Sequence, residues 1–172
     1  MEKKNAQLTT KRLILKAFSE CHRAAMLDIF CNEAIKKTYM LPDFESKEQA
    51  NPLFDKFVAF SNGNERFLYG VFLGNTPIGF INECEKQDAM MELGYVIAPE
   101  HQGKGFATEA VQACIHELFR MGYEHVRAGY FEGNTASRRV MEKCGMQKLP
   151  LEEDIEYKGV LRHCFYFGID KD

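Results

Sequence analysis

The sequence of 172 residues lacks long apolar segments, and its longest uninterrupted apolar runs contain four residues. A membrane helix needs about 20 such residues, so we expect none. The opening segment, MEKKNAQLTTKR, carries charge but has no apolar stretch behind it, which is unlike a secretory signal. We therefore expect a cytoplasmic protein that is not inserted in a membrane.

Neither sign of charge dominates, because 22 basic residues stand against 25 acidic ones. No basic stripe is present, so nucleic acid is not an expected partner. The six cysteines form no CxxC pair, and a cytoplasmic chain keeps its thiols reduced, so we expect buried free cysteines. The five histidines are scattered, and His116-Glu117 lacks the second histidine of a zinc-protease helix, so we expect no metal site.

The chain has no linker, internal repeat or low-complexity tract, and 45% hydrophobic with 27% charged residues is typical of a globular protein. We expect a single domain over residues 1–172. The sequence pattern predicts strands at 12–18, 66–73, 77–84, 89–97 and 125–131, and helices at 106–121 and 134–144. Two earlier helices, capped by Ser19 and Ser46, should run to about Phe30 and Phe60, with a loop at 36–44 between them.

The tail between residues 147 and 168 predicts an antiparallel hairpin, with its turn at either 152–154 or 158–159. A helix separates the strands at 89–97 and 125–131, so these two should be parallel through a right-handed crossover. The expected fold class is α+β, with one mixed, mostly antiparallel sheet flanked by helices.

The segment at residues 92–108, ELGYVIAPEHQGKGFAT, is the most informative one. A strand ends, a loop with two glycines follows, and a helix begins. The unpaired N–H groups and the dipole of a helix N-terminus attract a phosphate, and glycines let the backbone approach it. Lys104 adds positive charge. The alternative is a tight turn that binds nothing.

Two phosphate-binding motifs fit this loop poorly. A Walker loop, GxxxxGK[ST], is absent, and the dinucleotide motif G-x-G-x-x-G lacks its third glycine, because Thr108 stands there. A dinucleotide-binding domain remains an alternative.

The loop QGKGFA at residues 102–107 resembles the acetyl-CoA signature Q/R-x-x-G-x-G/A of the GNAT superfamily of N-acetyltransferases. Downstream, NTASRRVMEKCGM at 134–146 is similar to the second motif of the family, N-x-x-S-x-x-φ-x-x-K-x-G-F. TKRLIL at 10–15 resembles the opening strand of the branch that includes ribosomal-protein N-terminal (alanine) acetyltransferases.

This resemblance implies a sheet in which two neighbouring parallel strands splay apart to hold acetyl-CoA. It also implies transfer of the acetyl group, by direct attack, to a primary amine on a protein N-terminus or a small molecule. The implied cofactor contacts are the backbone of Tyr95, Val96 and Ile97 for pantetheine, Gln102, Gly103, Lys104, Gly105, Phe106, Ala107 and Thr108 for pyrophosphate, and Asn134 from the opposite side. Asn134 would equally serve as a helix cap.

The resemblance places Glu92 near the acetyl group as a general base acting through water. The alternative for this carboxylate, which stands in an otherwise apolar strand, is a structural salt bridge. Many relatives carry a tyrosine as general acid where this chain has Met141, so Ser137 is the expected substitute, with Tyr130 or water as alternatives.

The amine acceptor is expected to enter past Tyr39, Met40 and Phe44, residue types that equally suit a core. The acidic residues Glu152, Glu153, Asp154 and Glu156 either attract a cationic amine or form a solvated turn. A CoA-binding sensor or accessory protein without turnover is the alternative function. The sequence leaves open whether the protein is a monomer or a homodimer.

Overall fold

The computed structural model describes residues 1–172, which form an eight-stranded sheet in the order β1-β2-β3-β4-β5-β6-β8-β7. The strands are β1 (Gln7–Thr9), β2 (Ile14–Lys16), β3 (Leu68–Leu73), β4 (Thr76–Gln87), β5 (Met90–Ile97), β6 (His125–Phe131), β7 (Gln147–Tyr157) and β8 (Val160–Asp170). The helices are α1 (Arg23–Phe30), α2 (Glu33–Lys36), α3 (Lys47–Asn62), α4 (Phe106–Met121) and α5 (Thr135–Lys143), with short 3-10 turns η1 (Glu20–His22) and η2 (Pro99–His101).

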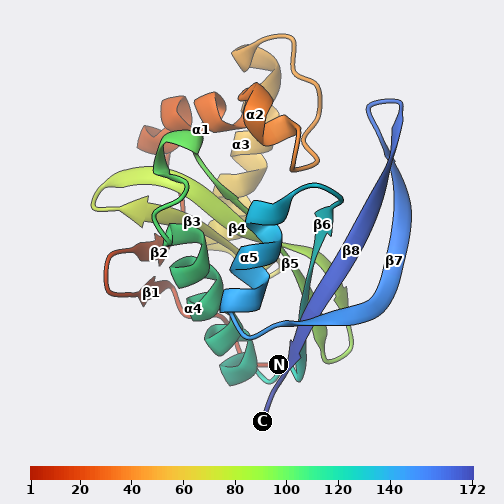
Figure 1. The fold of residues 1–172 in the computed structure, drawn as a ribbon. Helices are drawn as coiled ribbons and strands as arrows, with labels where there is room; N and C mark the ends of the chain where they lie inside the picture. The colour runs from red at the N-terminus through yellow and green to blue at the C-terminus, as the bar shows by residue number, and fades with distance from the viewer.

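Helices cover both faces of this sheet, with α4 and α5 on one face and α1, α2 and α3 on the other (Figure 1). The alternation of side chains along β5 connects the two layers. Met91, Leu93 and Ile97 belong to the core under α4 and α5, whereas Val96 belongs to the core under α1 to α3. Glu92 shares the parity of Val96 and therefore faces the α1–α3 side of the sheet.

The pairing of β5 with β6 is the only parallel pairing in the sheet, and it is short. It joins Met90 with His125, Met91 with Val126 and Glu92 with Arg127. Beyond this point β5 continues beside β4 alone, and β6 continues beside β8 alone. The expected fold class, a mixed sheet with a splayed pair of parallel strands, is therefore confirmed. The backbone groups that face each other across the gap have no partner strand.

The N-terminal elements differ from the sequence prediction. The strand expected at residues 12–18 is present but shorter, as β2, and β1 before it was not expected. The two strands are separated by a turn in which the Leu13 N–H donates to Thr10 Oγ1 at 3.0 Å. The loop expected at 36–44 begins inside α2, a four-residue helix capped by the Asn32 side chain. The helix expected after Ser19 starts as the 3-10 turn η1 before it becomes α1.

The expected C-terminal hairpin is confirmed with its turn at Lys158-Gly159, one of the two expected positions, and the other position, a solvated turn at 152–154, is wrong. Those acidic residues lie within β7, where Lys148 and His163 pair with two of them. The tip of the hairpin is fastened to the segment after α2. The Tyr157 hydroxyl donates to the Leu41 carbonyl at 2.9 Å, and Lys158 pairs with Asp43. None of the helices combines the length and the apolar composition needed to cross a membrane.

Gly79 sets how closely β4 approaches β5. A Cβ atom at this position would lie 1.9 Å from the Val96 carbonyl oxygen, and a backbone atom cannot rotate away as a side chain can. We expect Gly79→Ala to lower the free energy of unfolding by about 1–3 kcal/mol, the usual cost of overpacking. Urea unfolding of the variant and the wild type measures this loss. An unchanged midpoint would show that β5 shifts freely against β4.

Candidate active site

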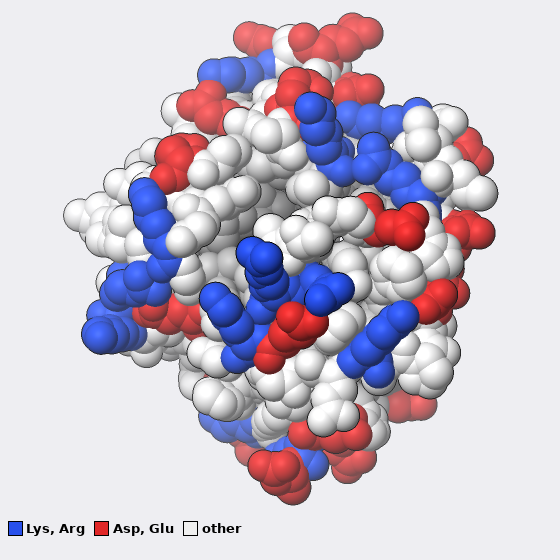
Figure 2. Space-filling model, viewed as in Figure 1, with Lys and Arg blue, Asp and Glu red and all other residues white.

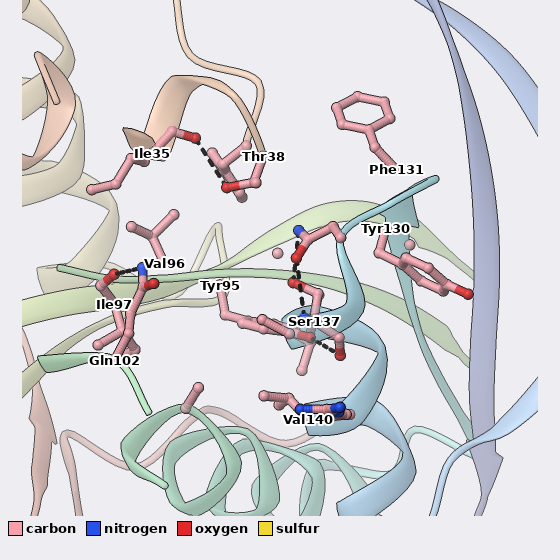
Figure 3. Close-up of a pocket in the computed structure, with 18 of the residues that line it drawn as sticks. Ile35, Thr38, Tyr95, Val96, Ile97, Gln102, Tyr130, Phe131, Ser137 and Val140 are labelled. Atoms are coloured by element: carbon pink, nitrogen blue, oxygen red, sulfur yellow. Dashed lines mark hydrogen bonds between the residues drawn. The ribbon is translucent and has the colours of Figure 1, made fainter. Parts of the chain in front are cut away.

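A cavity of about 660 Å³ lies at the gap between β5 and β6 (Figure 3). It is bordered by α2 and the residues after it, by β4, β5, β6, β7 and β8, by the loop from η2 to α4, and by α5. Twelve of the thirteen expected site residues line it: Glu92, Tyr95, Val96, Ile97, Gln102, Gly103, Gly105, Phe106, Ala107, Thr108, Asn134 and Ser137. The splay of the sheet thus brings both motifs to one cavity.

Lys104 is the expected site residue that does not line the cavity. Its ammonium group donates to the Glu100 carbonyl at 2.8 Å, so the side chain turns back along η2. The charge expected from Lys104 is therefore placed outside the cavity.

The glycine loop leads into α4 through two residues with left-handed backbone. Gly103 has φ +73° and Gly105 has φ +82°, values that other residues adopt with strain. Gly105 is the N-cap of α4 and supplies no capping side chain, so the first N–H groups of this 16-residue helix are uncapped by side chains. A Cβ atom on Gly103 would find no atom within 4 Å, so the loop is open on this side. These features make a cradle for an anion.

The start of α5 is fastened to β5 by a chain of hydrogen bonds (Figure 3). Asn134 caps the helix by accepting from the Ser137 N–H at 3.2 Å, and its amide donates to Ser137 Oγ at 3.1 Å. The Tyr95 hydroxyl donates to the Ser137 carbonyl at 3.0 Å. Because Ser137 Oγ accepts from Asn134, its own hydroxyl hydrogen is free to point elsewhere.

Glu92 both lines the cavity and forms the salt bridge that the alternative interpretation expects. Its Oε2 accepts from Arg127 Nε at 2.7 Å, and Arg127 Nη2 donates to Glu85 at 2.6 Å. The pair sits at the last rung before the strands splay, with 14% of the Glu92 side chain and 19% of the Arg127 side chain exposed. Burial raises the pKa of Glu92, while the Arg127 guanidinium acts in the opposite direction.

The face of the cavity toward α2 is largely apolar. Tyr39 and Met40 line it, as expected for the acceptor side, whereas Phe44 packs against the core under α1 to α3. The Tyr39 hydroxyl donates to Asn82 Oδ1 at 2.6 Å. Met141 is fully buried in the other core and does not reach the cavity. Tyr130 lines the cavity, but its ring packs against Phe165 and Phe167.

Several cavity residues were missed by the sequence analysis: Cys84, Arg139, Lys143, Cys164 and Tyr166. Cys84 is exposed, in contrast to the expected buried cysteines, because it opens onto the cavity where β4 has its irregular register. Cys21 is exposed as well. The residue as a whole is exposed, but its thiol is largely removed from water, and this burial raises the pKa of the Cys84 thiol to about 12, so it stays protonated at neutral pH. Tyr166 lies beneath the Arg127 guanidinium, 5.4 Å from it.

Comparison with known proteins identifies the family to which this chain is similar. A family model described as an acetyltransferase (GNAT) domain matches residues 12–147. YoaA of Bacillus subtilis (strain 168), an uncharacterized N-acetyltransferase, is 32% identical over 165 residues, which cover 92% of this chain and 88% of YoaA. The ribosomal-protein-serine acetyltransferase of Escherichia coli (strain K12) is 25% identical over 118 residues, covering 66% of each protein.

Among solved structures, RimL, a ribosomal alpha-N-protein acetyltransferase in complex with coenzyme A, has the same fold. Its TM-score is 0.82 at 18% identity, with 98% of each chain covered. The chain therefore belongs to the GNAT acetyltransferase family, and it is an N-acetyltransferase. The resemblance seen in its two motifs is confirmed, and its relatives include ribosomal-protein acetyltransferases.

The Glu92–Arg127 pair predicts a pH-dependent loss of stability in Arg127→Met. Without Arg127, the raised pKa of the buried Glu92 carboxyl rises further. A carboxyl whose pKa is raised in the folded state stabilises that state below its unfolded pKa, and this contribution is lost as pH rises through the folded pKa. We therefore expect the free energy of unfolding of Arg127→Met to be slightly below that of the wild type near pH 4.5. At pH 8 it should be lower by up to about 3 kcal/mol.

Urea unfolding at both pH values measures this deficit. Arg138→Met is the matched control, because Arg138 pairs with Glu142 on the exposed side of α5 and its loss should cost little at either pH. A deficit of the same size at pH 4.5 and pH 8 would contradict the assigned role of the pair.

Proposed function

We propose that this enzyme transfers the acetyl group of acetyl-CoA to a primary amine by direct attack of the amine on the thioester, in the cytoplasm. The observation that carries the proposal is the gap between β5 and β6, whose free backbone edges open onto the uncapped N-terminus of α4. An extended arm with amide groups and a phosphorylated end matches these two features in one ligand.

In this proposal the pantetheine arm pairs with the free edge of β5 near Tyr95, Val96 and Ile97, as an added strand pairs with a sheet edge. The Gln102 side chain holds the end of this edge by donating to the Ile97 carbonyl at 2.8 Å. The pyrophosphate rests on the N–H groups of the loop from Gln102 to Ala107, with the Thr108 hydroxyl beside it. Asn134 closes the gap from α5.

Glu92 acts as the general base in the proposed reaction. An amine must lose a proton to attack the thioester, and a carboxylate accepts it directly or through a water molecule. Arg127 holds Oε2 of Glu92, and no protein group donates to Oε1, which is left for the amine or the water. When the C–S bond breaks, the departing thiolate takes a hydrogen bond from the free hydroxyl hydrogen of Ser137.

The acceptor enters on the α1–α3 side, past Tyr39 and Met40, because Glu92 faces that side. A protein N-terminus and a small-molecule amine both present the required group. The names of the ribosomal-protein acetyltransferases among the relatives favour the N-terminus. A screen of thiol release from acetyl-CoA across N-terminal peptides and small amines distinguishes these acceptors. Absence of steady release with every amine would instead favour a CoA sensor.

The anion cradle is tested by two variants at Gly103, where the left-handed backbone tolerates Asn and Asp better than other residues. Gly103→Asn and Gly103→Asp add side chains of equal size into open space, and only the second adds negative charge. We expect the aspartate variant to bind acetyl-CoA about tenfold more weakly than the asparagine variant, and the difference to shrink in high salt. Calorimetric titration with acetyl-CoA and with NAD measures both affinities. Preferred binding of NAD would favour the dinucleotide alternative.

The role of Glu92 is tested by Glu92→Gln, which keeps the size of the side chain and removes the base. We expect turnover at pH 7 to fall about 10²–10³-fold while the affinity for acetyl-CoA changes little. The defect should shrink toward pH 9–10, where free amine becomes plentiful. The pH–rate profiles of both proteins on the best acceptor measure this. Equal rates at pH 7 would remove Glu92 from the mechanism, and a defect that is constant with pH would indicate a role in orienting the substrate.

A further inference from the structure

Two glycines determine what surrounds the acceptor side of the cavity. Gly94 of β5 and Gly129 of β6 lie two residues beyond the last pair of the parallel strands, so both face the α1–α3 side of the sheet. A Cβ atom on Gly94 would lie 2.7 Å from Cys84 Sγ and 2.8 Å from the Tyr39 hydroxyl oxygen. One on Gly129 would lie 2.9 Å from the Tyr166 ring. Side chains of neighbouring segments therefore occupy this space, and they set the chemistry that an acceptor meets.

The residues that line this side of the cavity are mostly apolar. They include Ala34, Ile35, Met40, Phe131, Ile155 and Tyr166. Two hydroxyl groups on this side already have partners, because Thr38 donates to the Ile35 carbonyl at 3.3 Å (Figure 3) and Tyr39 donates to Asn82. An acceptor with many polar groups would find few partners here, and a polar group that leaves water without a partner costs free energy.

Charge is equally sparse on the acceptor side. Glu92 is the only carboxylate that lines the cavity. Glu153 of β7 faces the same side as its cross-strand partner Cys164, but it is exposed and does not line the cavity. The cations Arg139 and Lys143 line the cavity from α5 without a salt bridge. Figure 2 shows uncharged side chains inside the hollow of this face, with Lys and Arg side chains over α5 at its border. The chamber thus offers one anionic partner to one ammonium group.

We propose that the acceptor is a primary amine with an apolar substituent, carried by a small aliphatic or aromatic amine or by a peptide N-terminus with an apolar first side chain. This inference rests on the proposed function and narrows its acceptor class. The amine meets Glu92, and the substituent lies against Ile35, Met40 and Ile155. Burial of an apolar substituent stabilises the complex, whereas a second ammonium group would lose its water without gaining a carboxylate. Polyamines and aminosugars are therefore poor acceptors.

The test measures kcat/KM from thiol release by acetyl-CoA with two matched pairs of acceptors. Pentylamine and cadaverine have the same chain and differ in a methyl against an ammonium group. Peptides that begin with methionine or with lysine make the same comparison at a protein N-terminus. We expect the apolar member to react about tenfold or more efficiently, because its burial is not opposed by loss of a hydrated charge. The pair that reacts identifies the source of the amine.

Equal or reversed preference within the reactive pair would overturn the inference. Turnover with polyamines or aminosugars alone would also overturn it, while the proposed function would stand. Absence of thiol release with every amine would instead contradict the proposed function itself.

Met40 provides a matched pair of variants at the rim of the chamber. It lines the cavity while 50% of the residue is exposed, so the fold should tolerate both Met40→Glu and Met40→Gln. These variants have the same shape and differ in one charge. Relative to Met40→Gln, Met40→Glu should reduce the preference for the apolar member of the reactive pair about threefold, because the new carboxylate attracts the second ammonium group.

The control is Leu161→Glu, which adds the same charge to an exposed position of β8 outside the cavity. This variant should keep the wild-type preference. Equal preferences in the two Met40 variants would contradict the placement of the substituent against Met40. An equal change in Leu161→Glu would show that the overall charge of the protein, rather than the chamber, sets the selectivity.

Discussion

Unpaired backbone in the middle of a sheet is the constraint on which the rest of this structure depends. N–H and C=O groups need partners when they leave water, and an interior strand normally finds them on both sides. Here β5 and β6 are paired only up to Glu92 and Arg127 and then diverge. The divergence leaves two strand edges inside the molecule rather than at its border. A ligand with amide groups is the natural partner for such an edge.

The cavity formed at this gap is polarised. Glu92 is the only carboxylate among its lining residues, and it faces the α1–α3 side of the sheet. The free cations, Arg139 and Lys143, lie on α5, which covers the other face. In the proposed reaction this separation would draw the phosphorylated cofactor and a cationic amine to different ends of the cavity. The sheet keeps the two ends apart, and the gap lets the reactants meet.

Elements with strong local signals could be predicted from the sequence with their observed bounds. The helix at 106–121 has a continuous apolar stripe and a glycine stop, and the strand at 125–131 follows directly. The glycine loop before α4 could also be predicted, because it consists of consecutive residues from Gln102 to Thr108. By contrast, the four residues of α2 are too few to show a helical period, and the split between β1 and β2 depends on the Thr10 side chain.

The site residues that the sequence did not predict are brought to the cavity by the packing of segments that lie far apart in the chain. Arg127 meets Glu92 because of the register of two parallel strands, which one sequence does not reveal. Arg139 and Lys143 lie on a helix with a single buried residue, so the apolar pattern says little about which side faces the cavity. Lys104 was predicted to line the site because it lies inside the motif, but its side chain donates to the neighbouring Glu100 carbonyl instead.

The position of β8 in the sheet affects how the protein folds during synthesis. This strand follows every other element in the chain, yet it inserts between β6 and β7 and brings Cys164 and Tyr166 to the cavity. When the chain is synthesised, the earlier strands leave the ribosome before β8, so one edge of β6 is still unpaired. Such an edge readily pairs with other chains, and distant pairings form slowly. Pairing of β8 with β6 therefore both completes the lining of the cavity and covers a strand edge that is otherwise open to pairing with other chains.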